Sequence, residues 1–143
     1  MSILITGANG EIGIDLVKKL SNKYKILAIY RTKNKKIKKI KNVIWIKWDL
    51  KKKIKKNFKP VPKYIIHCAV DQKYLKKNKK KYIQSNYIII KNLINFANKN
   101  KVKLIINMSS IDVYGDIRKN LLNENYYCNK PNVYGLSKSL SEL

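Results

Sequence analysis

Three glycines follow the first apolar run of the chain at intervals of three residues. The run 3–6 is short and apolar, as in a buried strand, and Gly7, Gly10 and Gly13 come directly after it. Residues 11–20 then carry apolar side chains three and four positions apart, which is the spacing of one helix face. The chain therefore opens with a predicted strand, a tight turn and a helix.

Strand-like and helix-like runs continue to alternate along the rest of the chain. We expect strands at residues 3–6, 25–30, 43–46, 64–69 and 103–108, and helices at 11–20, 74–98 and from about 133. The stretch 114–131 is rich in asparagine and has no periodicity, so we expect a loop there. This alternation predicts one α/β domain over residues 1–143, a doubly wound, Rossmann-like parallel sheet with strand order 3-2-1-4-5.

The formal net charge of +25 is the feature that most suggests a nucleic-acid partner. However, only Arg31 and Arg118 among the 33 basic residues are arginine, whereas phosphate and base recognition favour the planar arginine fork. The lysines are also spread through every segment, while a nucleic-acid binder would gather them on one face. We therefore interpret the charge as compositional drift and expect no specific nucleic-acid partner.

Cysteine usage and hydropathy argue against metal-cluster, disulfide-rich, secreted and membrane-spanning proteins. Cys68 and Cys128 are too few and wrongly spaced for a metal cluster or a disulfide framework, so we expect no metal and a reduced, cytoplasmic setting. The N-terminus has no basic segment or cleavage site, which favours a first strand over a signal peptide. No apolar run approaches the roughly 20 residues of a membrane span, so we expect no membrane partner.

A glycine-rich turn between a strand and a helix is suited to binding a phosphate. It lets the backbone approach the anion and directs helix N–H groups at it. We therefore predict dinucleotide binding at residues 7–13, the alternative being a tight turn with a glycine packing contact. Arg31 follows the second strand, where a basic residue suits a 2′-phosphate, so NADP is predicted, with NAD as the alternative. The alternative for Arg31 itself is a solvent-facing side chain.

Two further polar residues have competing interpretations. Asp49 follows the third strand and could accept a hydrogen bond from an adenine amino group, or cap a short helix. His67 is the only histidine and lies within an apolar strand, which favours a hydrogen-bonded core residue over a catalytic base.

Tyr134 and Lys138 are four residues apart in the last predicted helix, so they share one face. A tyrosine phenol has a pKa near 10 and becomes an effective acid/base at neutral pH only when its anion is stabilised, which a neighbouring ammonium can do. A hydroxyl from Ser110 or Ser109 could bind the substrate oxygen while hydride moves at the adjacent carbon. Alone, the pattern could also arise by chance in a chain rich in both residue types.

Together these segments resemble the extended short-chain dehydrogenase/reductase family of nucleotide-sugar epimerases, dehydratases and reductases. The resemblance runs from Ile3 to Glu142 and involves residues 6–13, 48–50, 67–70, 86–97, 109–115 and 131–138. It implies Ser110, Tyr134 and Lys138 as catalytic residues. The cofactor-binding residues that it implies are Gly7, Asn9, Gly10, Glu11, Ile12, Gly13, Arg31, Asp49, Leu50, Cys68, Ala69, Asn86, Tyr134 and Lys138.

The resemblance also implies a binding partner and indicates which part of such an enzyme the chain represents. The partner would be a nucleotide-sugar substrate, and the family allows a homodimer. The chain departs from the family pattern at Val70 and at Ile89 and Ile90, and it lacks the C-terminal strands and the sugar-binding region that follow the catalytic lysine in the family. We therefore expect the N-terminal part of such an enzyme, the alternative being a non-catalytic NADP-binding sensor.

Overall fold

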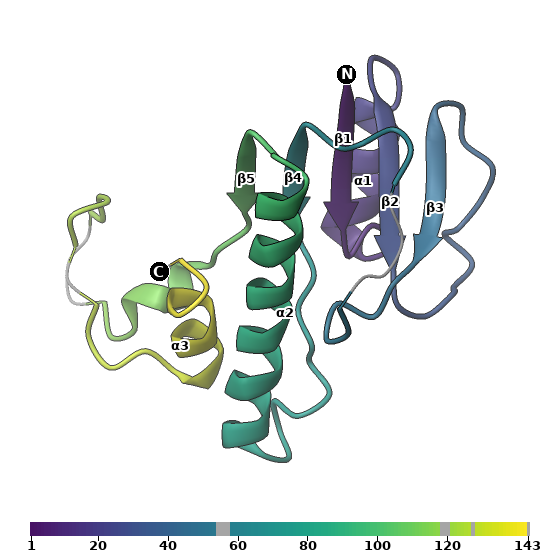
Figure 1. Ribbon diagram of the computed structural model, residues 1–143. Coiled ribbons are helices and arrows are strands. Elements are labelled where there is room, and N and C mark those ends of the chain that lie inside the picture. Colours follow the sequence, from purple (N-terminus) through teal and green to yellow (C-terminus); the bar gives the residue numbers. More distant parts are fainter. Residues whose placement is uncertain (54–57, 118–120, 127, 143) are drawn as a thin grey trace. The chain divides into compact units, whose positions relative to one another are not determined.

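A five-stranded parallel sheet forms the centre of the fold (Figure 1). The computed structural model describes residues 1–53, 58–117, 121–126 and 128–142. The strands are β1 (Ser2–Thr6), β2 (Lys25–Tyr30), β3 (Val43–Lys47), β4 (Tyr64–His67) and β5 (Leu104–Asn107). Their order is β3-β2-β1-β4-β5, and every neighbouring pair is parallel, which confirms the predicted doubly wound topology.

The helices differ from the sequence-based expectation mainly at their ends. They are α1 (Glu11–Leu20), α2 (Lys79–Lys99), the 3₁₀ helix η1 (Ile111–Tyr114) and α3 (Val133–Ser139). The long helix begins at Lys79 and not at residue 74, because the Asn78 side chain accepts a hydrogen bond from the Lys81 N–H at 2.9 Å and so caps the helix there. The helix η1 was not predicted, since four residues are too few to show a period.

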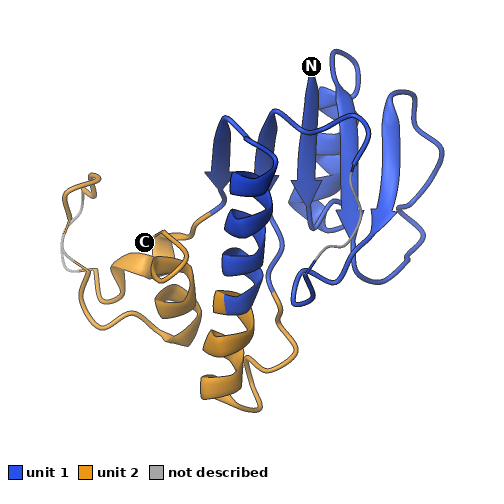
Figure 2. Ribbon diagram, viewed as in Figure 1, with its two compact units in different colours: residues 1–70, 88–108 blue, residues 71–87, 109–143 orange. Residues whose placement is uncertain are grey.

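The chain folds into two compact units (Figure 2). Unit 1 comprises residues 1–70 and 88–108 and contains the whole sheet, together with α1 and the C-terminal part of α2. Unit 2 comprises residues 71–87 and 109–143 and contains the N-terminal part of α2, η1 and α3. The boundary inside the long helix falls between Tyr87 and Ile88.

Both faces of the sheet are buried at its central strands β1, β2 and β4, as their apolar sequence requires. Successive side chains of a strand point to opposite faces, and β1 accordingly contributes to two separate clusters. Leu4 packs with Leu93 and Phe96 of α2 in one cluster. Ile3 and Ile5 pack in the other, which includes Val17 of α1.

Within the described residues, no helix combines the length and the apolar character needed to cross a bilayer. In the same parts of the chain, no group of three or more His, Cys, Asp or Glu side chains could hold a metal ion.

Candidate functional site

The glycine-rich turn of unit 1 brings the start of α1 against the end of β1. The Gly10 N–H donates to the Gly7 carbonyl at 2.9 Å, and the helix then starts with Glu11. A Cβ on Gly13 would lie far inside van der Waals contact with the Gly7 carbonyl, so only glycine allows α1 to pack this closely on the turn. Gly10 is the N-cap and has no side chain to cap the helix, so the first-turn N–H groups have no side-chain acceptor there.

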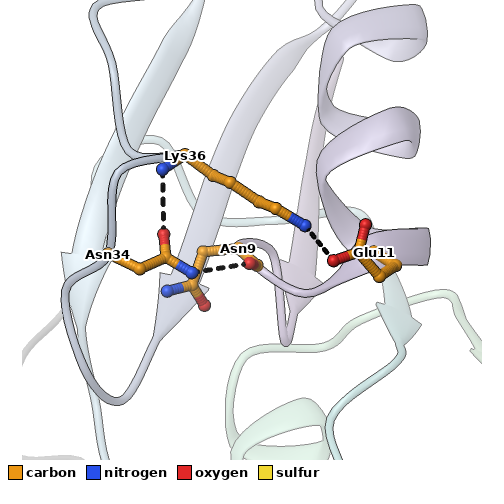
Figure 3. Close-up of polar contacts among 4 residues, drawn as sticks. All are labelled: Asn9, Glu11, Asn34 and Lys36. Carbon is orange, nitrogen blue, oxygen red and sulfur yellow. Dashed lines mark hydrogen bonds and ion pairs between the residues drawn. The ribbon is translucent and has the colours of Figure 1, made fainter.

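A second segment, the loop after β2, contacts this turn through polar groups (Figure 3). The Asn9 amide donates to the Thr32 carbonyl at 2.8 Å, and the Asn34 amide donates to the Asn9 carbonyl at 3.0 Å. The Lys36 ammonium forms an ion pair with the Glu11 carboxylate. The hydrogen bond from Lys36, and then its positive charge, lower the pKa of Glu11 below its usual value.

The adenine-side candidates follow the ends of β2 and β3. Arg31 comes directly after β2 and is exposed. Asp49 follows β3, and its carboxylate accepts a hydrogen bond from the Lys51 N–H at 3.2 Å. Residues 50–53, which are described, contain a turn and no helix starts among them, so the Asp49 carboxylate caps a turn and not a helix there. Leu50 is buried, and its carbonyl accepts a hydrogen bond from the Asn92 amide at 2.8 Å, which fixes the segment to α2 within unit 1.

Thr6 connects the ends of β1 and β4. Its hydroxyl oxygen accepts hydrogen bonds from the Cys68 and Ala69 N–H groups, each at 3.2 Å, and lies 2.6 Å from His67 Nδ1. Two acceptor positions are thus used, which leaves the Thr6 proton to donate to His67. These contacts confirm His67 as a buried, hydrogen-bonded residue. They also explain why β4 ends two residues earlier than predicted, since Cys68 and Ala69 turn toward the glycine-rich segment.

Asn86 holds the first residues of unit 2. Its side-chain oxygen accepts a hydrogen bond from the Asp71 N–H at 2.8 Å, and its amide donates to the Asp71 and Tyr82 carbonyls at 3.3 and 3.1 Å. Ser85 donates to the buried Asp71 carboxylate at 2.7 Å. The predicted cofactor residue Asn86 therefore uses both ends of its amide to fix the segment that follows β4.

Asp112 links the serine segment of unit 2 to the start of α3. Its carboxylate accepts a hydrogen bond from Ser110 at 2.8 Å and another from the Asn132 amide at 2.7 Å. Asn132 in turn caps α3, because its side-chain oxygen accepts a hydrogen bond from the Gly135 N–H at 2.8 Å. The hydrogen bond from Ser110, and then that from Asn132, lower the pKa of Asp112. The alternative serine, Ser109, donates to the Glu142 carboxylate.

The last helix presents Tyr134 and Lys138 on one face, as their spacing predicted. The Lys138 ammonium lies 5.9 Å from the centre of the Tyr134 ring. Lys138 is 7% exposed, whereas Tyr134 is partly exposed. The pair therefore places a positive charge beside a phenol within unit 2.

Sequence reasoning did not single out three residues that support these candidates. Asp112 and Asn132 link Ser110 to α3 by hydrogen bonds. Of the two, Asn132 could have been found from the sequence, because it directly precedes a predicted helix and asparagine is a common N-cap residue. Tyr82 is fully buried, and burial raises the pKa of its phenol, an effect that the neighbouring Ser137 hydroxyl partly offsets. Tyr82 occupies an apolar helical position, and no sequence pattern distinguishes it from a core residue.

Comparisons with known proteins found a matching family model and similar solved structures. The sequence matches the NAD dependent epimerase/dehydratase family over residues 3–143. A solved UDP-glucose 4-epimerase is 25% identical with a TM-score of 0.83, and the match covers 99% of this chain and 45% of that chain. A search of curated proteins found no match.

Two other solved structures are similar at lower identity. The Bordetella bronchiseptica enzyme WbmG in complex with NAD is 21% identical with a TM-score of 0.81, and the match covers 99% of this chain and 48% of that chain. The UDP-N-acetylglucosamine 4-epimerase of Methanobrevibacter ruminantium M1 in complex with UDP-N-acetylmuramic acid is 23% identical with a TM-score of 0.82, with coverage of 99% and 48%. The chain thus spans about half the length of the solved structures that it matches.

The close contact between α3 and η1 predicts that Gly135→Ala is destabilising. On an open helix face this change would stabilise the helix by about 1 kcal/mol. Here the new Cβ would clash with the Asp112 backbone carbonyl, so we expect a loss of roughly 1–3 kcal/mol, as for other overpacked sites. Urea unfolding and amide exchange of Leu136 and Leu140 would measure it. The control is Leu136→Ala on the exposed face of the helix, which should destabilise the chain less. Unchanged amide exchange rates in Gly135→Ala would contradict the close contact between α3 and η1.

The hydrogen bonds to Asp112 predict a pH dependence. Because its pKa is lowered from 3.8 in the folded chain, its contribution to stability is present above that value and is lost as the pH falls through the lowered pKa. Ser110→Ala should raise the pKa of Asp112 toward 3.8, since Ser110 is the largest cause of the shift. Carboxyl-carbon NMR titration would measure this change. Ser109→Ala is the control, and an equal shift in both variants would contradict the assignment.

Proposed function

Because the chain belongs to the NAD-dependent epimerase/dehydratase family, we propose that it supplies the cofactor-binding and acid/base residues of an oxidoreductase that acts on a nucleotide-linked sugar. The observation that carries the proposal is the Tyr134–Lys138 pair of α3, with the ammonium 5.9 Å from the ring centre. The structural neighbours named as UDP-sugar epimerases support the substrate class. The reaction would be an epimerisation, a dehydration or a reduction.

The proposed cofactor is a nicotinamide dinucleotide, and residues 1–143 are proposed as the domain that binds it. The turn at residues 7–13 fits a pyrophosphate because the cap residue Gly10 is exposed and has no side chain, so helix N–H groups are accessible to an anion. Ile12, Asp49, Leu50, Cys68, Ala69 and Asn86 complete the proposed set, with Tyr134 and Lys138. When bound, the dinucleotide supplies hydride transfer at its nicotinamide ring.

The proposed acid/base is Tyr134. As a proton leaves the phenol, negative charge develops on its oxygen, and the Lys138 ammonium would stabilise that charge. Ser110 would bind the sugar oxygen that gains or loses the proton. To do so it must donate its single proton to that oxygen, so the hydroxyl would rotate away from the Asp112 carboxylate, while its oxygen keeps the hydrogen bond from the Asp112 N–H at 3.2 Å. Asp112 would then act by orienting Ser110.

Arg31 is proposed to favour NADP over NAD. Arg31 directly follows β2, and in this class of fold the residue at that position contacts the ribose 2′ group of the cofactor. Neighbouring structures in complex with NAD make NAD the alternative.

The cofactor preference gives the first test of this proposal. We expect the chain to bind NADPH more tightly than NADH, and Arg31→Asp to reverse or abolish that preference, because a carboxylate repels the 2′-phosphate and accepts the ribose hydroxyls. Titration of reduced-nicotinamide fluorescence measures both affinities. Lys33→Asp makes the same change in charge two residues away and should have a smaller effect.

Two outcomes of that titration would count against the proposal. Tighter binding of NADH by the unmutated chain would overturn the NADP assignment. Failure to bind either dinucleotide would overturn the cofactor site itself.

The acid/base assignment is tested in a protein extended to the length of its solved relatives. There Tyr134→Phe should keep cofactor affinity while single-turnover hydride transfer falls by roughly 100-fold or more, the usual contribution of a positioned acid/base. Lys138→Met should lower both turnover and cofactor affinity. Ser110→Ala should lower the rate of hydride transfer more than the matched variant Ser109→Ala does. An undiminished transfer rate in Tyr134→Phe would show that the tyrosine is not the proton carrier.

A further inference from the structure

The first turn of α1 carries a negative charge at the place proposed for the cofactor pyrophosphate. Glu11 is the first residue of the helix, and its side chain is 91% exposed. A carboxylate in this position suits the helix dipole when no ligand is present. A pyrophosphate at the same helix end would be repelled by it, because like charges at short range disfavour each other. The turn therefore combines an anion-binding backbone with a fixed anionic side chain.

The loop after β2 supplies a cation to this carboxylate. The Lys36 ammonium is paired with Glu11 although the two residues are 25 positions apart, and the Lys36 side chain is only 27% exposed (Figure 3). The Lys36 N–H also donates to the Asn34 side-chain oxygen at 3.1 Å, and the Asn34 amide donates to the Asn9 carbonyl at 3.0 Å. Lys36 is thus held in place by the same contacts that join the loop to the glycine-rich turn.

Stability is a weak reason for this arrangement. An ion pair with one highly exposed partner contributes little to folding, because water screens it and a long lysine side chain loses freedom. The pair changes local charge more than it changes stability: with Lys36 in place, the net charge of Glu11 and its partner is zero. The loop that carries Lys36 also begins with Arg31, the residue proposed to read the ribose 2′ position.

We propose that Lys36 is a charge-compensating residue of the cofactor site: it neutralises Glu11, so that a dinucleotide pyrophosphate can bind at the start of α1. The inference rests on the proposed function, since it concerns how this chain binds a nicotinamide dinucleotide. It assigns Lys36 a role through Glu11 and not through direct contact with the ligand. Removing Glu11 together with Lys36 should therefore restore the affinity that is lost when Lys36 alone is removed.

A double-mutant cycle tests this role. The variants are Lys36→Gln, Glu11→Gln and the double variant. The measurement is the Kd for NADH and NADPH from nicotinamide fluorescence at about 0.1 M ionic strength, where the Debye length is about 10 Å. Lys36→Gln should weaken binding about 3-fold to 10-fold, the effect expected of one uncompensated negative charge near a pyrophosphate at a dielectric constant close to that of water. Glu11→Gln keeps the backbone N–H by which residue 11 would contribute to the cofactor site, and it leaves the Lys36 ammonium unpaired, so it should bind more tightly than the unmutated chain. The double variant carries neither charge, so the pair is again neutral and its Kd should lie within about 2-fold of that of the unmutated chain.

Two controls separate compensation from a general loss of charge. Lys35→Gln removes the same charge from a neighbouring exposed position and should change Kd by less than about 2-fold, because screening weakens more distant charges. Lys36→Arg keeps the cation and should restore the affinity that Lys36→Gln loses.

The outcomes distinguish this inference from the proposed function. If the unmutated chain binds neither dinucleotide, the proposed function fails. If it binds one and Lys36→Gln has no effect, the compensating role is wrong. If the double variant binds as weakly as Lys36→Gln, Lys36 contacts the cofactor directly, and compensation is again overturned.

Discussion

The parallel pairing of β1 with β2 on one side and β4 on the other determines where the candidate cofactor residues of unit 1 lie. In this register Thr6 pairs with Ile29 and with His67, so the three strands end at the same edge of the sheet. The segments that leave this edge are the glycine-rich turn, the Arg31 loop and the Cys68–Ala69 segment. The Ala8 N–H donates to the Ile29 carbonyl at 2.9 Å, and Thr6 binds the Cys68 and Ala69 N–H groups, so hydrogen bonds connect the three segments.

Unit 2 depends on a similar connection made by one carboxylate. Asp112 accepts hydrogen bonds from Ser110 and Asn132, and its backbone packs against Gly135 with no room for a side chain. These contacts fix the serine segment relative to the helix that carries Tyr134 and Lys138. The proposed chemistry requires this arrangement, since a proton carrier is effective only within hydrogen-bond reach of the group that it serves. Asp112 would therefore affect the reaction through position.

The charge of the chain has two different consequences. Most lysines lie on solvated surfaces, as their even spread suggested, and they contribute to solubility more than to specificity. Lys36 differs from these solvated lysines because backbone and side-chain contacts hold it beside Glu11. Arg31 differs from them because it begins the loop that carries Lys36 and has a proposed role in binding the cofactor. The two sites proposed for the dinucleotide, the glycine-rich turn and the ribose side, are therefore joined by polar contacts within unit 1. A net charge of +25 gives no information about such local pairing.

The sequence alone determined the glycine-rich turn and the shared helix face of Tyr134 and Lys138, because each depends on a short spacing that backbone geometry converts directly into structure. The strand order could be predicted because alternating strands and helices adopt few topologies, of which the doubly wound sheet is one. The sequence could not determine the start of α2, the end of β4 or the helix η1, which depend on individual side-chain hydrogen bonds made by Asn78, Thr6 and Ser110. Only the tertiary structure paired Lys36 with Glu11 and placed Asp112 between Ser110 and Asn132. Such contacts join residues that are distant in sequence, and many lysines and asparagines could have made them equally well, so the folded backbone selects the partner.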